Sequence, residues 1–263
     1  MTLGVTGPPG AGKSTLVDQL AKALRRSAQT VGIIAVDPSS PFSRGAILGD
    51  RIRMQDHHDD PGVFIRSMAT RGRLGGLAQS TLEMALLFDA AGCNVVLIET
   101  VGVGQDEVDI ARLADITVLV LAPGFGDDVQ AMKAGIMEIA DVFAINKADL
   151  PGADRLEQEI RAMQSVADHA HAAPIRRVIA TEGVGVDELL TEIRSIFKRQ
   201  AQKSSGADTW AFRLREMLRD HVMESVSERD IELHATQVAS RIEDPYSALS
   251  ALRAGMTIGK QAP

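Results

Sequence analysis

A glycine-rich octapeptide near the first residue, Gly7-Pro-Pro-Gly-Ala-Gly-Lys-Ser14, holds the residues with the clearest chemical meaning. Glycines let a backbone wrap closely around phosphate oxygens, and N–H groups at the start of a following helix add donors. The lysine can reach terminal phosphates, and the serine can ligate Mg²⁺. Glycine-rich turns are common, but Gly-Lys-Ser at this offset predicts a phosphate-binding P-loop. Its expected residues are Gly7, Pro8, Pro9, Gly10, Ala11, Gly12, Lys13, Ser14 and Thr15.

A second motif, Asn146-Lys-Ala-Asp149, directly follows an apolar run and indicates which base is bound. The Asp149 carboxylate can accept hydrogen bonds from the ring N–H and the exocyclic amine of guanine, whereas adenine presents no matching amine. Lys147 can lie along the base plane, and Asn146 can tether the P-loop. The motif therefore favours guanine. The turn at Ala180 and Thr181 could add backbone donors to the guanine oxygen, or could only join a strand to a helix.

Acidic residues in loops could hold Mg²⁺ or orient the attacking water. Glu99 begins Glu-Thr-Val-Gly102, where many P-loop proteins have Asp-x-x-Gly, so its carboxylate can hold Mg²⁺ through water while the Gly102 N–H senses the γ-phosphate. Asp37 and Asp50 suit metal coordination, although loop aspartates are often caps or turns. Gln105 could orient water or be merely solvated. The expected metal ligands are Ser14, Asp37, Asp50 and Glu99, and the expected catalytic residues are Lys13, Asp37, Asp50, Glu99 and Gln105.

Two other groups of residues could bind a metal or take part in redox chemistry, but we expect neither to do so. The run His57-His58-Asp59-Asp60 has no second set of soft ligands elsewhere, so we expect a solvated turn. The single cysteine, Cys93, lies beside an apolar run and is expected to be a buried, inert thiol.

The elements that position these motifs follow from short apolar runs at 31–36, 94–99, 116–121, 142–146 and 177–180. The runs are continuous, which is typical of strands buried on both faces, and the intervening segments 74–91 and 156–170 have helical periodicity. We therefore predict an α/β P-loop NTPase fold, with a mostly parallel sheet and helices on both faces. The motifs follow strands, so they should converge at the C-terminal ends of the strands.

From about Lys203 the chain changes to charged amphipathic helix without strand signals. This change predicts a GTPase domain at 1–202 and a C-terminal helical segment at 203–263. Helical periodicity at 210–226 and 230–242 places an apolar stripe on one side of the first segment, formed by Trp210, Leu214, Met217, Leu218, Val222 and Val226. The stripe could pack on the core, but a small helical tail has little core of its own, so we favour a homodimer.

Composition excludes several classes of protein. In 263 residues, 45% hydrophobic and 24% charged content are ordinary globular values. A net charge of -7 and 3% aromatic residues argue against a nucleic-acid surface. Apolar runs stay well short of the roughly 18 residues of a membrane span, and the P-loop leaves no room for a signal peptide ahead of it. With one cysteine, these features predict a cytoplasmic protein that binds no membrane.

Together the motifs resemble the MeaB/ArgK family of GTPases, which contains the methylmalonic aciduria type A protein. The resemblance covers about residues 3–200, and the ending at 244–249 is also similar. It rests on the P-loop, Val36-Asp-Pro-Ser-Ser40, Ile47-Leu-Gly-Asp-Arg-Ile-Arg-Met54, Arg66-Ser-Met-Ala-Thr-Arg-Gly72, Glu99-Thr-Val-Gly-Val-Gly-Gln105 and Asn146-Lys-Ala-Asp149.

The resemblance implies a homodimeric, Mg²⁺-dependent GTPase that hydrolyses GTP to GDP and phosphate. It implies a chaperone that gates adenosylcobalamin loading and protects methylmalonyl-CoA mutase or a related acyl-CoA mutase. The segment Pro123 to Lys133 matches a switch loop that couples nucleotide state to the mutase. Family members usually carry a helical extension before the first strand, and this chain begins essentially at that strand, so either the sequence is truncated or this is a shortened member. The departure leaves open the surroundings of the first strand and part of the mutase-binding surface, whereas we expect the nucleotide site to be unaffected.

Two other functions stay open. A small-molecule kinase of the amino-acid-transport type would also use a P-loop, but it has little need for Asn-Lys-x-Asp. A GTPase that inserts nickel or cobalt would need thiolate or histidine clusters, which one cysteine and six scattered histidines support poorly.

Overall fold

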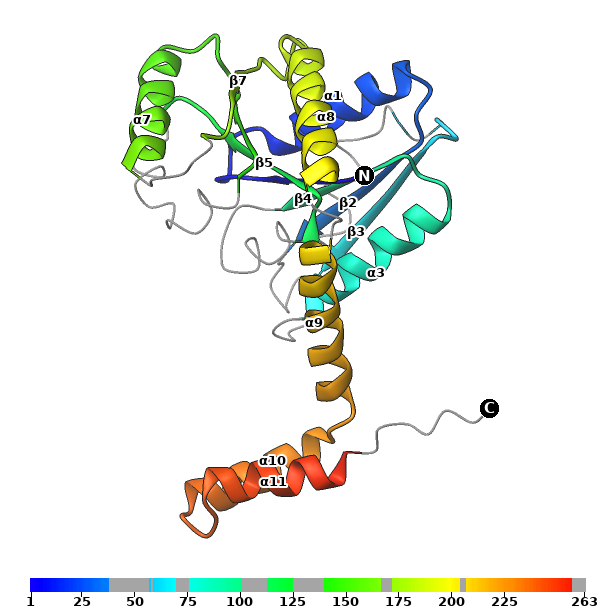
Figure 1. Ribbon diagram of the computed structural model, residues 1–263, viewed down its shortest axis with the longest axis vertical. Helices are drawn as coiled ribbons and strands as arrows, with labels where there is room; N and C mark the ends of the chain where they lie inside the picture. The colour runs from blue at the N-terminus through cyan, green and yellow to red at the C-terminus, as the bar shows by residue number, and fades with distance from the viewer. Residues whose placement is uncertain are drawn as a thin grey trace. The chain divides into compact units, whose positions relative to one another are not determined.

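The chain forms two compact units, Met1–Trp210 and Ala211–Pro263 (Figure 1). The division between the two units, after Trp210, falls inside the helix α9 (Ala207–Glu224). The boundary after residue 202, between a GTPase domain and a C-terminal helical segment, stays a prediction. The computed structural model describes residues 1–37, 57, 59–69, 76–100, 113–124, 140–166, 172–203 and 207–256.

Within its described residues, the first unit is built on a seven-stranded sheet in which every pair is parallel, in the order β3-β2-β4-β1-β5-β6-β7. This arrangement confirms the predicted α/β fold. The strands are β1 (Thr2–Thr6), β2 (Val31–Asp37), β3 (Val63–Ala69), β4 (Val95–Thr100), β5 (Ile116–Leu121), β6 (Val142–Ile145) and β7 (Ile175–Arg177).

The central and the edge strands differ in how easily the sequence predicts them. Every residue of β4 and β5 is buried, as their continuous apolar runs indicate. The edge strand β3 was missed because Arg66 and Ser67 interrupt its apolar residues after Ile65. The strand predicted at 177–180 lies earlier, as β7 at Ile175–Arg177, and the residues after it include Ile179, which forms an isolated antiparallel bridge with Val184.

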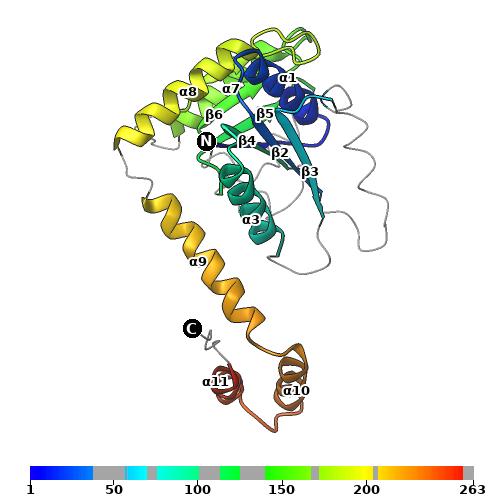
Figure 2. The same ribbon diagram turned by 90° about the vertical axis from the view of Figure 1, so that its right-hand side faces the viewer.

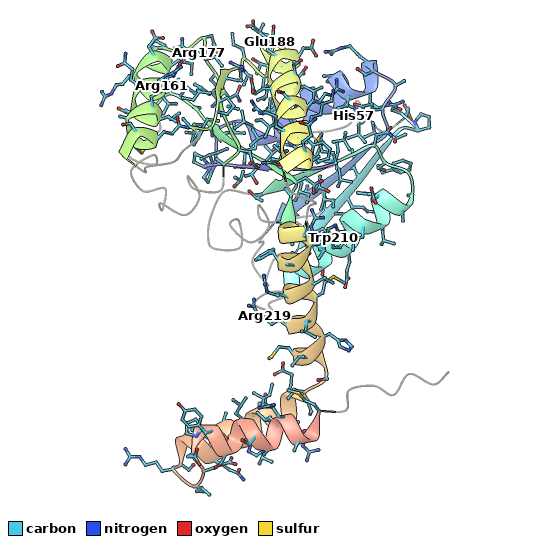
Figure 3. All side chains as sticks on the ribbon, viewed as in Figure 1. His57, Arg161, Arg177, Glu188, Trp210 and Arg219 are labelled. Atoms are coloured by element: carbon cyan, nitrogen blue, oxygen red, sulfur yellow. The ribbon has the colours of Figure 1, made fainter. Side chains whose placement is uncertain are left out.

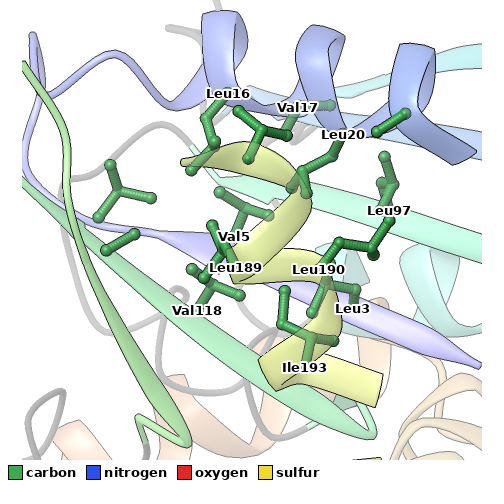
Figure 4. Packing of buried hydrophobic residues seen from close by; sticks show 14 of the residues in the cluster. Leu3, Val5, Leu16, Val17, Leu20, Leu97, Val118, Leu189, Leu190 and Ile193 are labelled. Carbon is green, nitrogen blue, oxygen red and sulfur yellow. The ribbon is translucent and has the colours of Figure 1, made fainter. Parts of the chain in front are cut away.

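Helices cover both faces of the sheet (Figure 2). The first face holds α1 (Lys13–Arg26) and α8 (Val186–Lys203), and the second holds α3 (Gly76–Ala90) and α7 (Ala153–Val166). Successive side chains of a strand point to opposite faces, so Val118 joins the α1 and α8 cluster while Leu119 joins the α7 cluster. Figure 4 shows the first cluster, where leucines of α1 and α8 meet on Leu3, Val5 and Val118. This core fixes α1, and therefore the P-loop, against the sheet.

The second unit contains the rest of α9 (Ala207–Glu224), then α10 (Glu228–Ala239) and α11 (Pro245–Gly255). The helix α11 begins at an N-cap, Asp244, whose carboxylate accepts from the backbone N–H groups of Tyr246 and Ser247. Within the described residues, none of the helices is both long and apolar enough to cross a membrane.

Candidate nucleotide-binding site

The P-loop joins β1 to α1 through glycines that no other residue could replace without strain. Gly7 has φ +142°, and a Cβ built on it would lie 2.1 Å from the Val120 carbonyl oxygen. Gly12, the N-cap of α1, has φ +89°, and a Cβ there would lie 2.3 Å from Asn146 Nδ2. The backbone therefore turns closely past both neighbours and directs the start of α1 into the loop.

Lys13 lies inside this turn rather than in solvent. The residue is 6% exposed, and its ammonium donates to the carbonyl oxygens of Gly7 (2.7 Å) and Pro8 (3.0 Å). A buried cation next to helix N–H groups makes a strong site for an anion, since both add positive potential in the same place. The lysine is therefore positioned to exchange carbonyl oxygens for phosphate oxygens.

Ser14 and Glu99, two of the predicted magnesium ligands, are brought together from different elements. Ser14 is in the first turn of α1, Glu99 is near the end of β4, and the serine hydroxyl donates to the glutamate Oε1. Parallel register places Glu99 beside Val5 of β1, just before the P-loop. A hydroxyl and a largely buried carboxylate are the hard oxygen ligands that Mg²⁺ prefers, so these residues fit the ion.

Asn146 connects the P-loop with the turn at 180. Its side-chain Nδ2 donates to the Ala11 carbonyl oxygen (2.8 Å), and its Oδ1 accepts from the Ala180 backbone N–H (3.0 Å). The residue is only 2% exposed, so both halves of the amide are satisfied where water does not reach. Since the Ala180 N–H is already used, the predicted donation to a guanine oxygen would come from another group of that turn.

The other residues of the guanine motif also lie at this end of the sheet. Lys147 has φ +55°, and its ammonium donates to the Gly10 carbonyl oxygen at 2.8 Å. Asp149 is exposed two residues further on. The predicted tether between the motif and the P-loop therefore consists of two side chains, one from Asn146 and one from Lys147.

Several predicted site residues lie outside the described residues: Asp50, Gly102, Gln105 and, within the proposed switch loop, residues 125–133. Asp37 is described only through its backbone, as the last residue of β2. Register places Ala35, two residues before it, beside Glu99, so β2 ends next to the strand that carries Glu99.

The solvated turn predicted for the histidine-aspartate run is wrong for His57 and Asp60, whereas Asp59 is exposed in a turn and His58 lies outside the described residues. His57 is 5% exposed and contacts Asp18 of α1, and Asp60 forms an ion pair with Arg25 of α1. The signal that could have revealed these contacts is a row of charged residues along one side of an otherwise apolar helix. Among the described residues, no group of three or more His, Cys, Asp or Glu could hold a metal ion.

Cys93 is a buried, free thiol, as predicted. Burial, followed by the nearby Asp89 carboxylate, raises the pKa of the thiol, which keeps it protonated and unreactive.

The fold and these contacts define a P-loop nucleotide-binding protein. A family profile described as "Methylmalonyl Co-A mutase-associated GTPase MeaB" matches residues 1–235. The chain therefore belongs to the MeaB family of GTPases.

Individual relatives agree with this assignment. A provisionally named GTPase of Pyrococcus horikoshii is 48% identical over 257 aligned residues, covering 94% of this chain and 81% of that protein. The mitochondrial methylmalonic aciduria type A homolog of Mus musculus is 34% identical over 274, covering 99% of this chain and 63% of that protein. A crystal structure described as LAO/AO transport system kinase matches with a TM-score of 0.67 and 27% identity, covering 97% of this chain and 80% of that chain.

Proposed function

We propose that this chain is a Mg²⁺-dependent GTPase that converts GTP to GDP and phosphate. The observation that carries the proposal is the Asn146 side chain, which ties the P-loop to the turn at 180 and begins the guanine motif. A site that reads guanine through Asp149 and binds phosphates through Lys13 needs these two loops in a fixed relation, which the buried amide provides.

The residues of the chain divide the work as follows. The ammonium of Lys13 and the N–H groups at the start of α1 stabilise charge that develops on the phosphate oxygens. Ser14 and Glu99, with Asp37 and Asp50 as further proposed ligands, would hold Mg²⁺, which neutralises phosphate charge when it is bound. Gln105 or one of the loop carboxylates would orient the attacking water, and Gly102 would sense the γ-phosphate.

We further propose that the nucleotide state controls association with an adenosylcobalamin-dependent acyl-CoA mutase, most simply methylmalonyl-CoA mutase. The family description and the methylmalonic aciduria type A homolog support this partner. In this role the chain gates cofactor loading and protects the mutase, and the segment 123–133 transmits the nucleotide state.

Hydrolysis and capture assays test the two parts separately. We expect slow GTP hydrolysis by the purified chain, faster hydrolysis with the mutase, and little hydrolysis of ATP. Rapid hydrolysis that no mutase alters would contradict a regulated switch. Capture of candidate mutases should differ between GDP and a non-hydrolysable GTP analogue, and equal capture in both would contradict nucleotide gating.

Base recognition is tested by Asp149→Asn. An amide cannot accept both guanine donors, so guanine affinity should fall at least tenfold and preference should shift towards xanthine. Fluorescent GDP and XDP titrations measure both affinities. Unchanged GDP affinity would remove Asp149 from the base site.

Homodimerisation through α9 is proposed because large apolar residues on it are exposed, including Leu214 (58%) and Leu218 (62%). The double variant Leu214→Glu/Leu218→Glu should lower the mass measured by light scattering to that of one chain. An unchanged mass would exclude this helix face. Cell fractionation tests the proposed cytoplasmic location.

A kinase is the second candidate, because one similar crystal structure is described as a transport system kinase. Transfer of labelled phosphate from ATP or GTP to an amino acid or a protein would favour it over hydrolysis. A metal-insertion role would be supported by stoichiometric nickel after incubation with excess metal and desalting.

A further inference from the structure

The segment that carries Asp149 is attached, on the side before Asp149, to the chain that leaves β7. Asn146 Oδ1 accepts from the Ala180 N–H at 3.0 Å. The Ala148 N–H donates to the Val178 carbonyl oxygen at 3.2 Å. Asp149 itself is exposed, and within the described residues its side chain makes no hydrogen bond or ion pair. Its position therefore depends on how the chain is held on both sides of it.

The turn after β7 supplies the other group of the proposed base site. Most N–H groups of this turn already donate to acceptors in the described chain, namely those of Ala180, Glu182, Gly183 and Val184. In the described stretch 180–184, the Thr181 N–H makes no such bond and is left to donate to a ligand. A base held by Asp149 and Thr181 contacts two segments, so its recognition needs a fixed distance between them.

Arg177, the last residue of β7, attaches the chain on the side after Asp149. Its Nε donates to Glu157 Oε2 at 2.7 Å, and its Nη2 lies 2.7 Å from Asp154 Oδ1 and 2.6 Å from Glu157 Oε2. Both carboxylates belong to the first two turns of α7, the helix that follows Asp149. Figure 3 labels Arg177 at α7. The guanidinium therefore joins β7 to the start of this helix.

This attachment of α7 is directional, unlike its apolar packing. Glu157 accepts from Arg161 through Oε1 at 2.7 Å and from Arg177 through Oε2, and these bonds keep the pKa of Glu157 below its ordinary value. Ala153 and Leu156 bury the other side of the helix against the sheet. Apolar burial has no direction, whereas hydrogen-bonded ion pairs fix an orientation. The ion pairs with Arg177 therefore orient the first turns of α7 on β7.

The backbone of Arg177 contacts the end of the turn that carries Thr181. Gly185 has φ +77°, and a Cβ built on it would lie 2.2 Å from the Arg177 carbonyl oxygen. The turn therefore closes directly on this residue. Arg177 thus contacts the Asp149 side of the base site through its guanidinium and the Thr181 side through its carbonyl group.

We infer that Arg177 is a positioning residue for guanine recognition. It acts through Asp154 and Glu157 on the position of Asp149, and this inference rests on the proposed binding of guanine at Asp149. Loss of the guanidinium should weaken recognition of the guanine edge. Phosphate binding at Lys13 should not change, because the core of α1 and α8 holds the P-loop separately.

Competition against a fluorescent GDP analogue tests this inference with GDP, IDP and pyrophosphate. IDP lacks the exocyclic amine that would donate to Asp149, so the ratio of GDP affinity to IDP affinity reports that contact. In Arg177→Gln this ratio should fall about three- to tenfold, while the pyrophosphate affinity stays within about twofold of the wild type.

The neighbouring Arg176 provides a matched control. Its side chain is 43% exposed against 45% for Arg177, and it forms an ion pair with Glu192 of α8, on the opposite face of the sheet. Arg176→Gln should leave the GDP-to-IDP ratio unchanged. Arg177→Lys keeps the charge without the planar fork and should restore part of the ratio. Adding Asp154→Asn to Arg177→Gln should cause no further loss, because both changes remove the same attachment.

Salt provides a readout that a general loss of stability would not reproduce. Asp154 is 82% exposed, so salt screens its pair with Arg177. GDP and IDP carry the same charge, so screening of their phosphates cancels in the ratio. Raising KCl from about 0.05 to about 0.5 M should lower the ratio for the wild type and not for Arg177→Gln. The wild-type measurement needs no variant, and an unchanged ratio there would contradict the inference even if Arg177→Gln fails to fold.

The outcomes separate this inference from the proposed function. A folded Arg177→Gln chain with the wild-type ratio, or an equal loss in Arg176→Gln, would overturn the positioning role. A wild-type chain that binds GDP and IDP equally, or binds neither, would instead overturn the proposed guanine site at Asp149.

Discussion

Leu20 on α1 and Leu218 on α9 are leucines in amphipathic helices of similar design, yet Leu20 is 0% exposed and Leu218 is 62% exposed. The helix α1 has a sheet and α8 against its apolar side, so its leucines join one large buried cluster. In the second unit, Leu233, Ile242 and Tyr246 are also exposed, and Ala248 is the buried apolar residue of its described part.

The difference separates two uses of an apolar helix face. In the first unit the apolar side of α1 is buried and positions the P-loop, because burial in a close-packed core fixes α1 relative to β1 and β4. In the second unit the apolar faces remain available, and a helical segment this small gains little from its own core. Chemistry should therefore belong to the first unit and assembly to the second.

Lys13→Ala should give the largest effect and tests whether the first unit alone carries the chemistry. Removing the ammonium from the P-loop should lower the rate of GTP hydrolysis at least about 100-fold, as for other donors to developing charge. Single-turnover hydrolysis of labelled GTP measures the rate. The mass of the assembly should not change, and a change in mass would show that the two units are coupled.

The two single variants Leu20→Ala and Leu218→Ala test the comparison directly. The cavity left in the core by the first change should cost about 2–5 kcal/mol of unfolding free energy. The second change removes an exposed side chain and should cost less than about 0.5 kcal/mol in dilute protein. Urea unfolding measures both at several concentrations, and a cost at Leu218 that grows with concentration would indicate that the face is covered by a second copy.

The smallest expected effect is a pH dependence of stability that has opposite signs in the two units. Burial raises the pKa of Asp141, against hydrogen bonds from the Thr117 N–H and the Gln200 side chain. The native state then holds more protons than the unfolded state between the ordinary pKa of 3.8 and the raised value, so stability falls as pH rises through that window. Asp141→Asn should therefore stabilise the first unit more at pH 7 than below pH 3.8, where the carboxyl is protonated in both the native and the unfolded state. The Gln200 amide can turn to accept from the new amide.

At Asp244 the sign is reversed. Hydrogen bonds from the Ser247 side chain and backbone lower the pKa of this N-cap, so its stabilising contribution is present above the ordinary pKa of 3.8 and is lost as pH falls through the lowered value. Asp244→Ala should thus weaken the second unit at pH 7 and have less effect at the acid end. Helicity followed by circular dichroism measures this change. The same sign for both variants would contradict the assigned causes.

Local pattern was sufficient for most of the sheet and for the nucleotide motifs. The runs that became β4 and β5 are apolar at every position because both faces are buried, and that property is visible in the sequence itself. The P-loop and the Asn146 motif have fixed spacings because ligand geometry sets them. In contrast, β3 is an edge strand with exposed residues and has no continuous apolar run. The division between the two units, after Trp210, depends on which residues contact each other and not on composition.

The sequence by itself determined the ligand class, the fold class and the family, because these depend on residue types at short, fixed spacings. Only the tertiary structure decided that Lys147 donates to a P-loop carbonyl beside the predicted Asn146 tether, that Ser14 meets Glu99, and that His57 and Asp60 are held by α1 instead of being solvated. The physical reason is sequence distance. Each contact joins groups that are 35 to 137 residues apart, and which side chains meet there depends on the order of the strands and on the face each helix covers.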